Sequence, residues 1–155
     1  MPQINRKKTR KLLFQELFAG TFSKVETEEF YDSFYDWTFT FEIDEDYSKS
    51  MKQIIKDHEW FFIYIIEKFS PKFTIEKMNT MNVLPIYIAL AEIFYLKEDI
   101  PLKSSVNEAI ELAKVFSNDS SKKIVNWVLN KVIENLDELE KEKDNSYPTS
   151  YSLFK

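Results

Sequence analysis

A single glycine is the feature that most restricts how this chain of 155 residues can fold. Tight β-hairpins, and the phosphate-binding loops of the Walker or dinucleotide type, need glycine at defined positions. With Gly20 alone, those phosphate loops are excluded and a sheet built on hairpins is disfavoured. Hydrophobic residues make up 44% of the chain, which is long enough for one domain with its own core. The sequence therefore predicts a single compact all-α domain.

Apolar residues recur at helical spacing along most of the chain, and this pattern predicts about six or seven helices. The stripes cover residues 13–18, 30–37, 46–68, 82–95, 106–116 and 124–139. The third stripe fits either one long helix or two. Residues 38–43 alternate like a strand, but no partner strand is evident, so an extended connection is predicted there.

Several residues mark where helices should begin. Ser105 and Glu108 match the capping box, in which the two side chains satisfy exposed backbone donors at a helix start. Pro85 is expected in the first turn of a helix that begins near Asn82, where its missing N–H costs nothing. The polar stretch 117–121 is predicted to be a turn that caps the last long helix.

The domain is predicted to cover residues 1–143, with a basic arm at 1–11. Residues 144–155 are polar and aromatic without a period, so we expect a flexible C-terminal tail. No apolar run approaches the roughly 18 residues typical of a membrane span, and no secretory signal pattern is evident. The absence of cysteine excludes disulfides and fits a reducing compartment, so we expect a cytoplasmic protein without membrane contact.

Residues that could carry catalysis are scarce. His58 is the only histidine, and its neighbours Asp57 and Glu59 indicate a solvated helix face. No glycine is placed to form a strained nucleophile turn, and one histidine cannot build a histidine metal cluster. The acidic run 137–144 alternates in sign, which is typical of an exposed helix end. We therefore predict no catalytic residue, no metal site and no cofactor, and we expect that the protein is not an enzyme.

The stretch NRKKTRK, residues 5–11, holds both arginines of a chain whose formal net charge is −5. Positive charge at a helix N-terminus opposes the macrodipole at a cost of about 0.3–1 kcal/mol per charge, so local stability does not explain this basic arm. An anionic partner would explain it, whereas the alternative is a merely solvated arm. Helical spacing places the arginines beyond the buried stripe of Leu13 and Leu17, at the rim of the domain. Because arginine suits phosphate and stacks on bases, we predict RNA contacts. The candidates are Arg6, Lys7, Lys8, Arg10 and Lys11.

Residues 86–132 read IYIALAEIFYLKEDIPLKSSVNEAIELAKVFSNDSSKKIVNWVLNKV. This stretch, in the C-terminal half of the chain, resembles the NusB family. That family shows a Tyr-Glu-Leu-type helix end, then Asp-(Ile/Val)-Pro, then Asn-Glu-Ala-(Val/Ile)-Glu-Leu-Ala-Lys, then a Val-Asn-Gly-Val-Leu-Asp-Lys helix. The N-terminus is similar too, because an arginine-rich motif precedes a Gln-x-Leu-Tyr helix. The matching residues are Arg6, Lys7, Lys8, Arg10, Gln15, Leu17, Phe18, Glu92, Asp99, Ile100, Pro101, Asn107, Glu108, Ala109, Ile110, Glu111, Leu112, Ala113, Lys114, Phe116, Ser121, Val125, Asn126, Val128, Leu129 and Lys131.

The resemblance implies a fold of two packed helical bundles and a role in transcription antitermination. It implies that the chain pairs with NusE, a small-subunit ribosomal protein, and holds boxA-type single-stranded RNA. Together they would help to load the antitermination complex on RNA polymerase during ribosomal RNA synthesis. Lys123 and Asn126, near the start of the last long helix, are further candidates for the RNA surface. A capping role for Asn126 and a solvated Lys123 are equally open.

The chain departs from the family at positions that bear on RNA binding. Ile124 replaces an aromatic residue that could stack on a base, and Trp127 replaces a glycine and would need extra room in the packing. The other departures are Phe18, Asn82, Val83, Tyr87 and Ser120. The alternative function is therefore a NusB-fold protein-interaction module that has lost most RNA recognition. Such a module would bind a ribosomal or transcription partner, or a second copy of itself as a homodimer.

Overall fold

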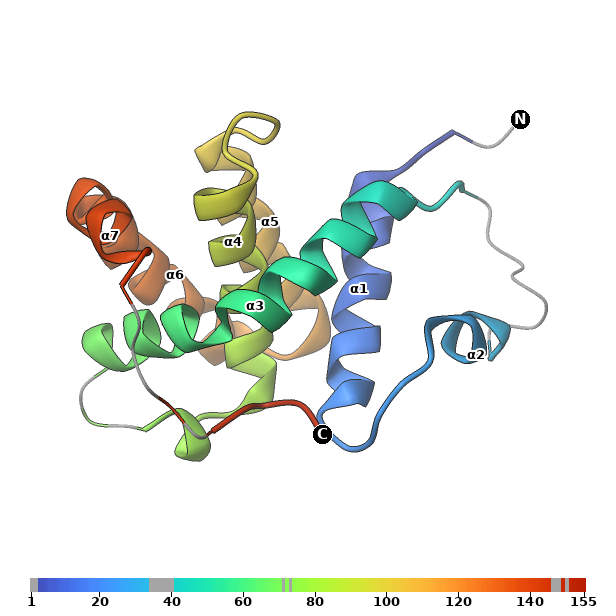
Figure 1. Cartoon of the computed structure of the whole chain (residues 1–155), viewed down its shortest axis with the longest axis horizontal. Coiled ribbons are helices and arrows are strands. Elements are labelled where there is room, and N and C mark those ends of the chain that lie inside the picture. Colours follow the sequence, from blue (N-terminus) through green and yellow to red (C-terminus); the bar gives the residue numbers. More distant parts are fainter. Residues whose placement is uncertain (1–2, 34–40, 71, 73, 146–148, 150) are drawn as a thin grey trace.

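The computed structural model describes residues 3–33, 41–70, 72, 74–145, 149 and 151–155. Within them, seven α-helices and one short 3₁₀ helix follow one another, and no strand is present (Figure 1). The helices are α1 (Arg6–Gly20), α2 (Thr27–Asp32), α3 (Glu45–Phe69), the 3₁₀ helix η1 (Ile75–Lys77), α4 (Thr80–Tyr95), α5 (Leu102–Phe116), α6 (Asp119–Glu134) and α7 (Leu136–Glu142). The predicted all-α class is confirmed. None of the described helices is long and apolar enough to cross a membrane.

Helix α4 lies at the centre of the molecule. Its residues from Asn82 to Phe94 are all buried, because α1, α3, α5 and α6 pack around it. Figure 1 shows α3 crossing in front of α4, with α1 beside it. Figure 1 shows that α1 and α4 run in opposite directions, and Arg10 in the first half of α1 pairs with Glu92 in the last half of α4. This pairing places the basic arm at the C-terminal end of α4.

Helix α3 covers the stretch for which one helix or two were predicted. It consists of two helical segments joined at a kink, because the backbone of His58 leaves helical geometry at φ −123° and ψ 15°. The His58 ring stacks on Tyr95 with the ring centroids 4.1 Å apart. Next to it, Glu59 is only 8% exposed. The prediction of a solvated face is therefore wrong for Glu59. His58 is half-buried instead of fully exposed to solvent.

Three predicted helix boundaries are wrong, and tertiary contacts or capping explain each. Asn79 caps α4 by accepting a hydrogen bond from the backbone N–H of Met81, so Pro85 falls in the second turn. Helix α5 already begins at Leu102, and Ser105 donates to Glu92 instead of forming a capping box. The last amphipathic stretch is divided at Asn135, where α6 ends and α7 follows.

The end of the chain packs against the helical body. Ser152 Oγ and the backbone N–H of Leu153 donate to Glu59, and Lys155 N–H donates to the carbonyl of Gly20. The predicted flexible tail is therefore wrong for residues 151–155. Residues 146–148 and 150 lie outside the described residues. The predicted helical pattern at 34–37 and the first part of the extended connection 38–43 also lie outside them. At the end of that connection, Glu42 forms an isolated parallel bridge with Ile4.

Candidate nucleic-acid interface

The basic arm forms the first turns of α1. Asn5 caps the helix, since its side-chain oxygen accepts the N–H of Lys8 at 2.9 Å. Arg6 donates from Nε and Nη2 to Asp44 at 3.2 and 3.1 Å, and its guanidinium lies 5.1 Å from the centre of the Tyr47 ring. The side chain of Arg6 is nevertheless 40% exposed, so part of it faces solvent.

Three lysines give the arm its accessible charge. Lys7 and Lys8 are exposed and Lys11 is half-buried. The ammonium of Lys8 lies 5.4 Å from the centre of the Phe41 ring, so a cation and an aromatic face share one surface. None of these lysines takes part in an ion pair with a described residue. No acidic side chain lies in the first turn of α1 to offset their charge.

Arg10 has a different environment, because its side chain turns into the protein and is only 5% exposed. Its Nε and Nη2 donate to the two carboxylate oxygens of Glu92 at 2.7 and 3.0 Å. The hydroxyls of Tyr47 and Ser105 also donate to Glu92, which completes a buried polar cluster. Burial acts to lower the pKa of Arg10, but the bonds and charge of Glu92 outweigh it, so the pKa of the guanidinium is raised.

The prediction that Arg10 projects at the rim of the domain is therefore wrong. The buried face of α1 does not stop at Leu13 but continues one turn further, to Arg10. The sequence pattern could not show that Arg10 is buried, because its partner Glu92 lies 82 positions away in the sequence. In a low-dielectric interior, a guanidinium that donates to both oxygens of a carboxylate holds two elements together and is not available to bind a ligand.

The second group of candidates does not join the basic arm. Lys123 is exposed on α6 and lies across from Asn82, at the opposite end of α4 from Glu92. Ten residues of helix separate Asn82 from Glu92, which is roughly 15 Å. Asn126 is also exposed on α6, and its suggested capping role is wrong because Asn118 caps this helix at the N–H of Ser121.

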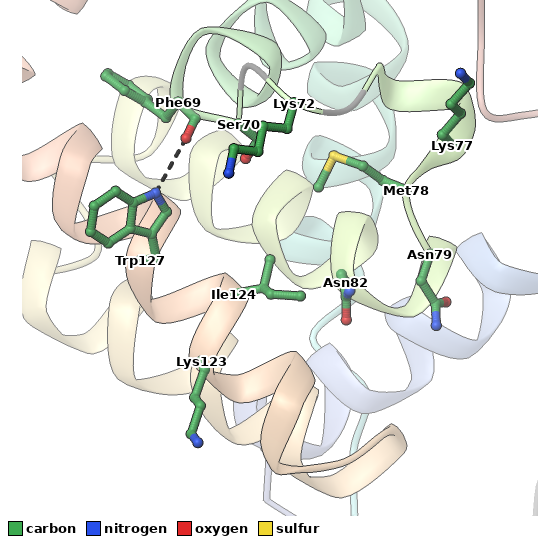
Figure 2. Close-up of a pocket in the computed structure, with 10 residues that line it drawn as sticks. All are labelled: Phe69, Ser70, Lys72, Lys77, Met78, Asn79, Asn82, Lys123, Ile124 and Trp127. Atoms are coloured by element: carbon green, nitrogen blue, oxygen red, sulfur yellow. Dashed lines mark hydrogen bonds between the residues drawn. The ribbon is translucent and has the colours of Figure 1, made fainter.

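Lys123 instead stands at the edge of a pocket of about 560 Å³. Figure 2 shows that the pocket lies between α6, the start of α4 and the connection that leads into α4. The described residues that line it are Phe69, Ser70, Lys72, Lys77, Met78, Asn79, Asn82, Lys123, Ile124 and Trp127. The sequence pattern does not reveal this pocket, because its residues come from segments that only the packing of α4 and α6 brings together.

Trp127 does not enter the core, so the prediction that it needs extra room there is wrong. The residue is 55% exposed, and its indole Nε1 donates to the carbonyl of Phe69 at 3.2 Å. Position 127 lies outside the core stripe of α6, which a helical wheel of the sequence would have shown. The core-facing residues of that helix are Ser121, Val125, Val128, Leu129 and Val132.

Two other departures from the family pattern are absorbed by the core. Val83 and Tyr87 are fully buried in α4. The hydroxyl of Tyr87 donates to Glu59 at 2.9 Å, and burial followed by the charge of Glu59 raises the pKa of Tyr87. These side chains cannot reach a ligand at the surface. Among the described residues, no group of three or more histidine or carboxylate side chains could hold a metal ion.

Comparison with known proteins gives a consistent result. The model of the NusB family matches residues 7–134 of the chain. The chain is 34% identical over 133 residues to a transcription antitermination protein NusB from Oceanobacillus iheyensis, which covers 84% of this chain and 99% of that protein. The protein of the same name from Clostridium acetobutylicum is 30% identical over 135 residues, covering 87% and 99%. That from Ligilactobacillus salivarius is 34% identical over 132 residues, covering 84% and 98%.

Proposed function

This chain belongs to the NusB family of transcription antitermination proteins, and we propose that it binds boxA-type single-stranded RNA together with NusE. In this proposal the pair acts in the cytoplasm and helps to load the antitermination complex on RNA polymerase at ribosomal RNA operons. Lys7, Lys8 and Lys11 contact the RNA backbone, and the open side of Arg6 adds to the same surface.

The observation that carries this proposal is the uncompensated charge at the start of α1. Lys7 and Lys8 stand in the first turn of α1, where positive charge is least favourable, and Lys11 follows in the next turn, in a protein that is acidic overall. A phosphate backbone supplies the negative charge that the described residues do not give to Lys7 and Lys11. Phe41 beneath Lys8 adds an aromatic face, which single-stranded bases use for stacking.

Arg10 has a positioning role in this function. Its bonds to Glu92 fix the first turns of α1 against α4. The centre of the Tyr47 ring lies 5.1 Å from the guanidinium carbon of Arg6 and 5.5 Å from that of Arg10. A helix that is held in this way presents its lysines in a fixed arrangement before RNA arrives. Preorganised contacts of this kind lose less entropy on binding.

The test is a salt titration of binding to a boxA-like single-stranded RNA. We expect the variant K7A/K8A/K11A to bind more weakly and with a shallower salt dependence. Each lost phosphate contact should reduce the slope of log K against log salt by about 0.7. The matched control K56A/K114A/K141A removes the same charge from exposed positions on other helices. If both variants bind as the unaltered chain does, the basic arm is not the RNA interface.

A calorimetric titration with NusE tests the second partner. We expect NusE to bind more tightly when boxA RNA is present, because the RNA would contact both proteins. Tight binding of NusE that RNA does not enhance, together with weak RNA binding by this chain, would favour the alternative of a protein-interaction module.

A further inference from the structure

Helix α7 is held to the helical body by few contacts. The match to the NusB family ends with α6, at residue 134, so α7 and the residues after it lie beyond that match. Leu139 is the one buried side chain of α7, and no described side chain caps the start of the helix. Glu140 and Glu142 form ion pairs with lysines of the body, but these groups are partly exposed and such pairs contribute little to stability. A small change in interaction can therefore detach α7.

Lys143 anchors the end of α7. Its ammonium donates to the backbone carbonyl of Phe94 at 3.2 Å and lies 5.3 Å from the centre of the Tyr95 ring. It also pairs with Glu140 at 2.9 Å, one turn back along the chain. This one side chain thus joins the end of α7 to the last residues of α4.

The ring of Tyr95 is shared with His58. The two rings stack with their centroids 4.1 Å apart and an angle of 14° between their planes. His58 is the only histidine of the chain, and it lies at the kink of α3. Imidazole is the side chain whose charge ordinarily changes near neutral pH. A group that can become cationic therefore contacts the same aromatic ring as the ammonium that anchors α7.

The surroundings of His58 suit the neutral ring. Its Nδ1 atom is buried and forms no hydrogen bond with a described residue. A protonated imidazole carries an N–H on both nitrogens, so Nδ1 would become a buried donor without an acceptor. Protonation therefore favours a state in which water reaches the ring.

The charged and titratable groups that face His58 come from three elements. They are Asp57 on α3, Tyr95 on α4, and Lys143 with Asp144 at the end of α7. Burial has the largest effect and lowers the pKa of His58; the charges of Asp57 and Asp144 act to raise it, and that of Lys143 acts to lower it. Because the pKa is lowered overall, the stabilisation is complete above the free value of about 6.5 and decreases as pH falls below it.

We propose that His58 and Lys143 form a pH-sensitive latch, in which protonation of the imidazole detaches Lys143 from Tyr95 and Phe94 and releases α7 from the helical body. In the latched state the neutral ring and the ammonium both contact Tyr95. In the released state both cations are solvated and Leu139 leaves the core. None of these residues belongs to the basic arm, so the latch does not depend on RNA binding.

The direct test is an NMR titration of the full chain from pH 7.5 to 5.5. A single histidine gives one set of imidazole signals, so its protonation is followed without ambiguity. Amide hydrogen exchange of residues 136–143 reports the release of α7, where the amides of Leu139 and Lys143 are hydrogen-bonded. Protection factors remove the intrinsic pH dependence of exchange.

We expect the protection of residues 136–143 to fall with the midpoint of the imidazole titration. The loss should not exceed about tenfold for each pH unit, which is the limit for one proton. Val128 and Leu129, which are buried in α6, should keep their protection. If the imidazole titrates while residues 136–143 stay protected, the proposal is overturned. An equal loss of protection in α6 would indicate global unfolding and would overturn it too.

Three variants test the residues of the latch. H58F keeps a flat ring beside Tyr95 but takes up no proton, so the protection of residues 136–143 should not change over this range; a loss equal to that of the unaltered chain would assign the trigger to another group. K143M keeps the apolar stem and removes the charge, which should move the imidazole midpoint to higher pH. D144N is the matched control of opposite sign and should move it to lower pH. If neither charge variant moves the midpoint, the end of α7 does not act on His58 and the proposal fails.

Discussion

Replacing Arg10 by methionine tests most directly whether this arginine anchors the fold or contacts RNA. Methionine keeps an unbranched apolar stem and removes the guanidinium. Arg10 and Glu92 have side chains only 7% and 1% exposed, and they share hydrogen bonds of 2.7 and 3.0 Å. The substitution would leave the Glu92 carboxylate buried without its positive partner.

The cost follows from that buried charge. Breaking a buried ion pair by removing one member typically costs about 3–5 kcal/mol, because the remaining charge is uncompensated. Glu92 keeps the hydroxyls of Tyr47 and Ser105 as donors, so we place the cost for R10M at the lower end, about 3 kcal/mol. For a chain of this size such a loss lowers Tm by about 6–12 °C.

The assay is urea unfolding followed by circular dichroism at pH 7. The matched control is R10M/E92Q, in which the glutamine carries no charge. Its single oxygen can accept from one of the hydroxyls of Tyr47 and Ser105, which bond to different oxygens of Glu92, and its NH₂ group can donate to the other. We expect this second change to restore about 1–3 kcal/mol, since it removes the buried unpaired charge. RNA binding measured well below the unfolding transition should show an almost unchanged salt slope for R10M.

One result would refute the reasoning. If R10M lowers the free energy of unfolding by less than about 1 kcal/mol and reduces the salt slope as strongly as a lysine substitution in the arm does, Arg10 is a surface contact and not an anchor.

Three further predictions concern the surroundings of Glu59 and His58. Deleting residues 151–155 should lower the free energy of unfolding by at least about 2 kcal/mol, because Glu59 loses two donors and apolar surface becomes exposed. An unchanged urea midpoint would contradict the observed packing of these residues. Y87F should cost about 1.5–3 kcal/mol through the lost bond to Glu59, and a cost near zero in the same assay would show that the bond contributes nothing. Burial lowers the pKa of His58, so the folded state favours the neutral ring; its contribution is complete above the unfolded pKa of about 6.5 and decreases as pH falls below it. The free energy of unfolding, measured from pH 7.5 to 5.5, should therefore fall less steeply in H58F than in the unaltered chain. Equal slopes would show that His58 does not contribute to the pH dependence of stability.

Much of the fold could be predicted because helix formation depends on nearby residues. The scarcity of glycine and the helical spacing of apolar residues are local properties, and both led to the all-α class and to most of the helices. The same spacing failed where a distant group intervened. Ser105 looks like a capping residue in its own segment, but its hydroxyl bonds to Glu92 on another helix.

The candidate site was only partly predictable for the same reason. The sequence singled out the basic arm and, through the family pattern, the start of α6. It could not separate Arg10 from the lysines beside it, because charge and spacing are the same whether or not a partner lies opposite. Nor could it show that Asn82, Lys123 and Trp127 share one pocket.

What the sequence determined by itself was a helical chain of the NusB type with a polarised charge at its N-terminus. The tertiary structure alone decided which charges remain available. Arg10 is buried because it pairs with Glu92, and the end of the chain packs on α3 because Leu153 bonds to Glu59. Trp127 lies at the surface of α6. The physical reason is that a buried charge must find its partner within hydrogen-bond distance, and only the folded chain sets which residues lie that close.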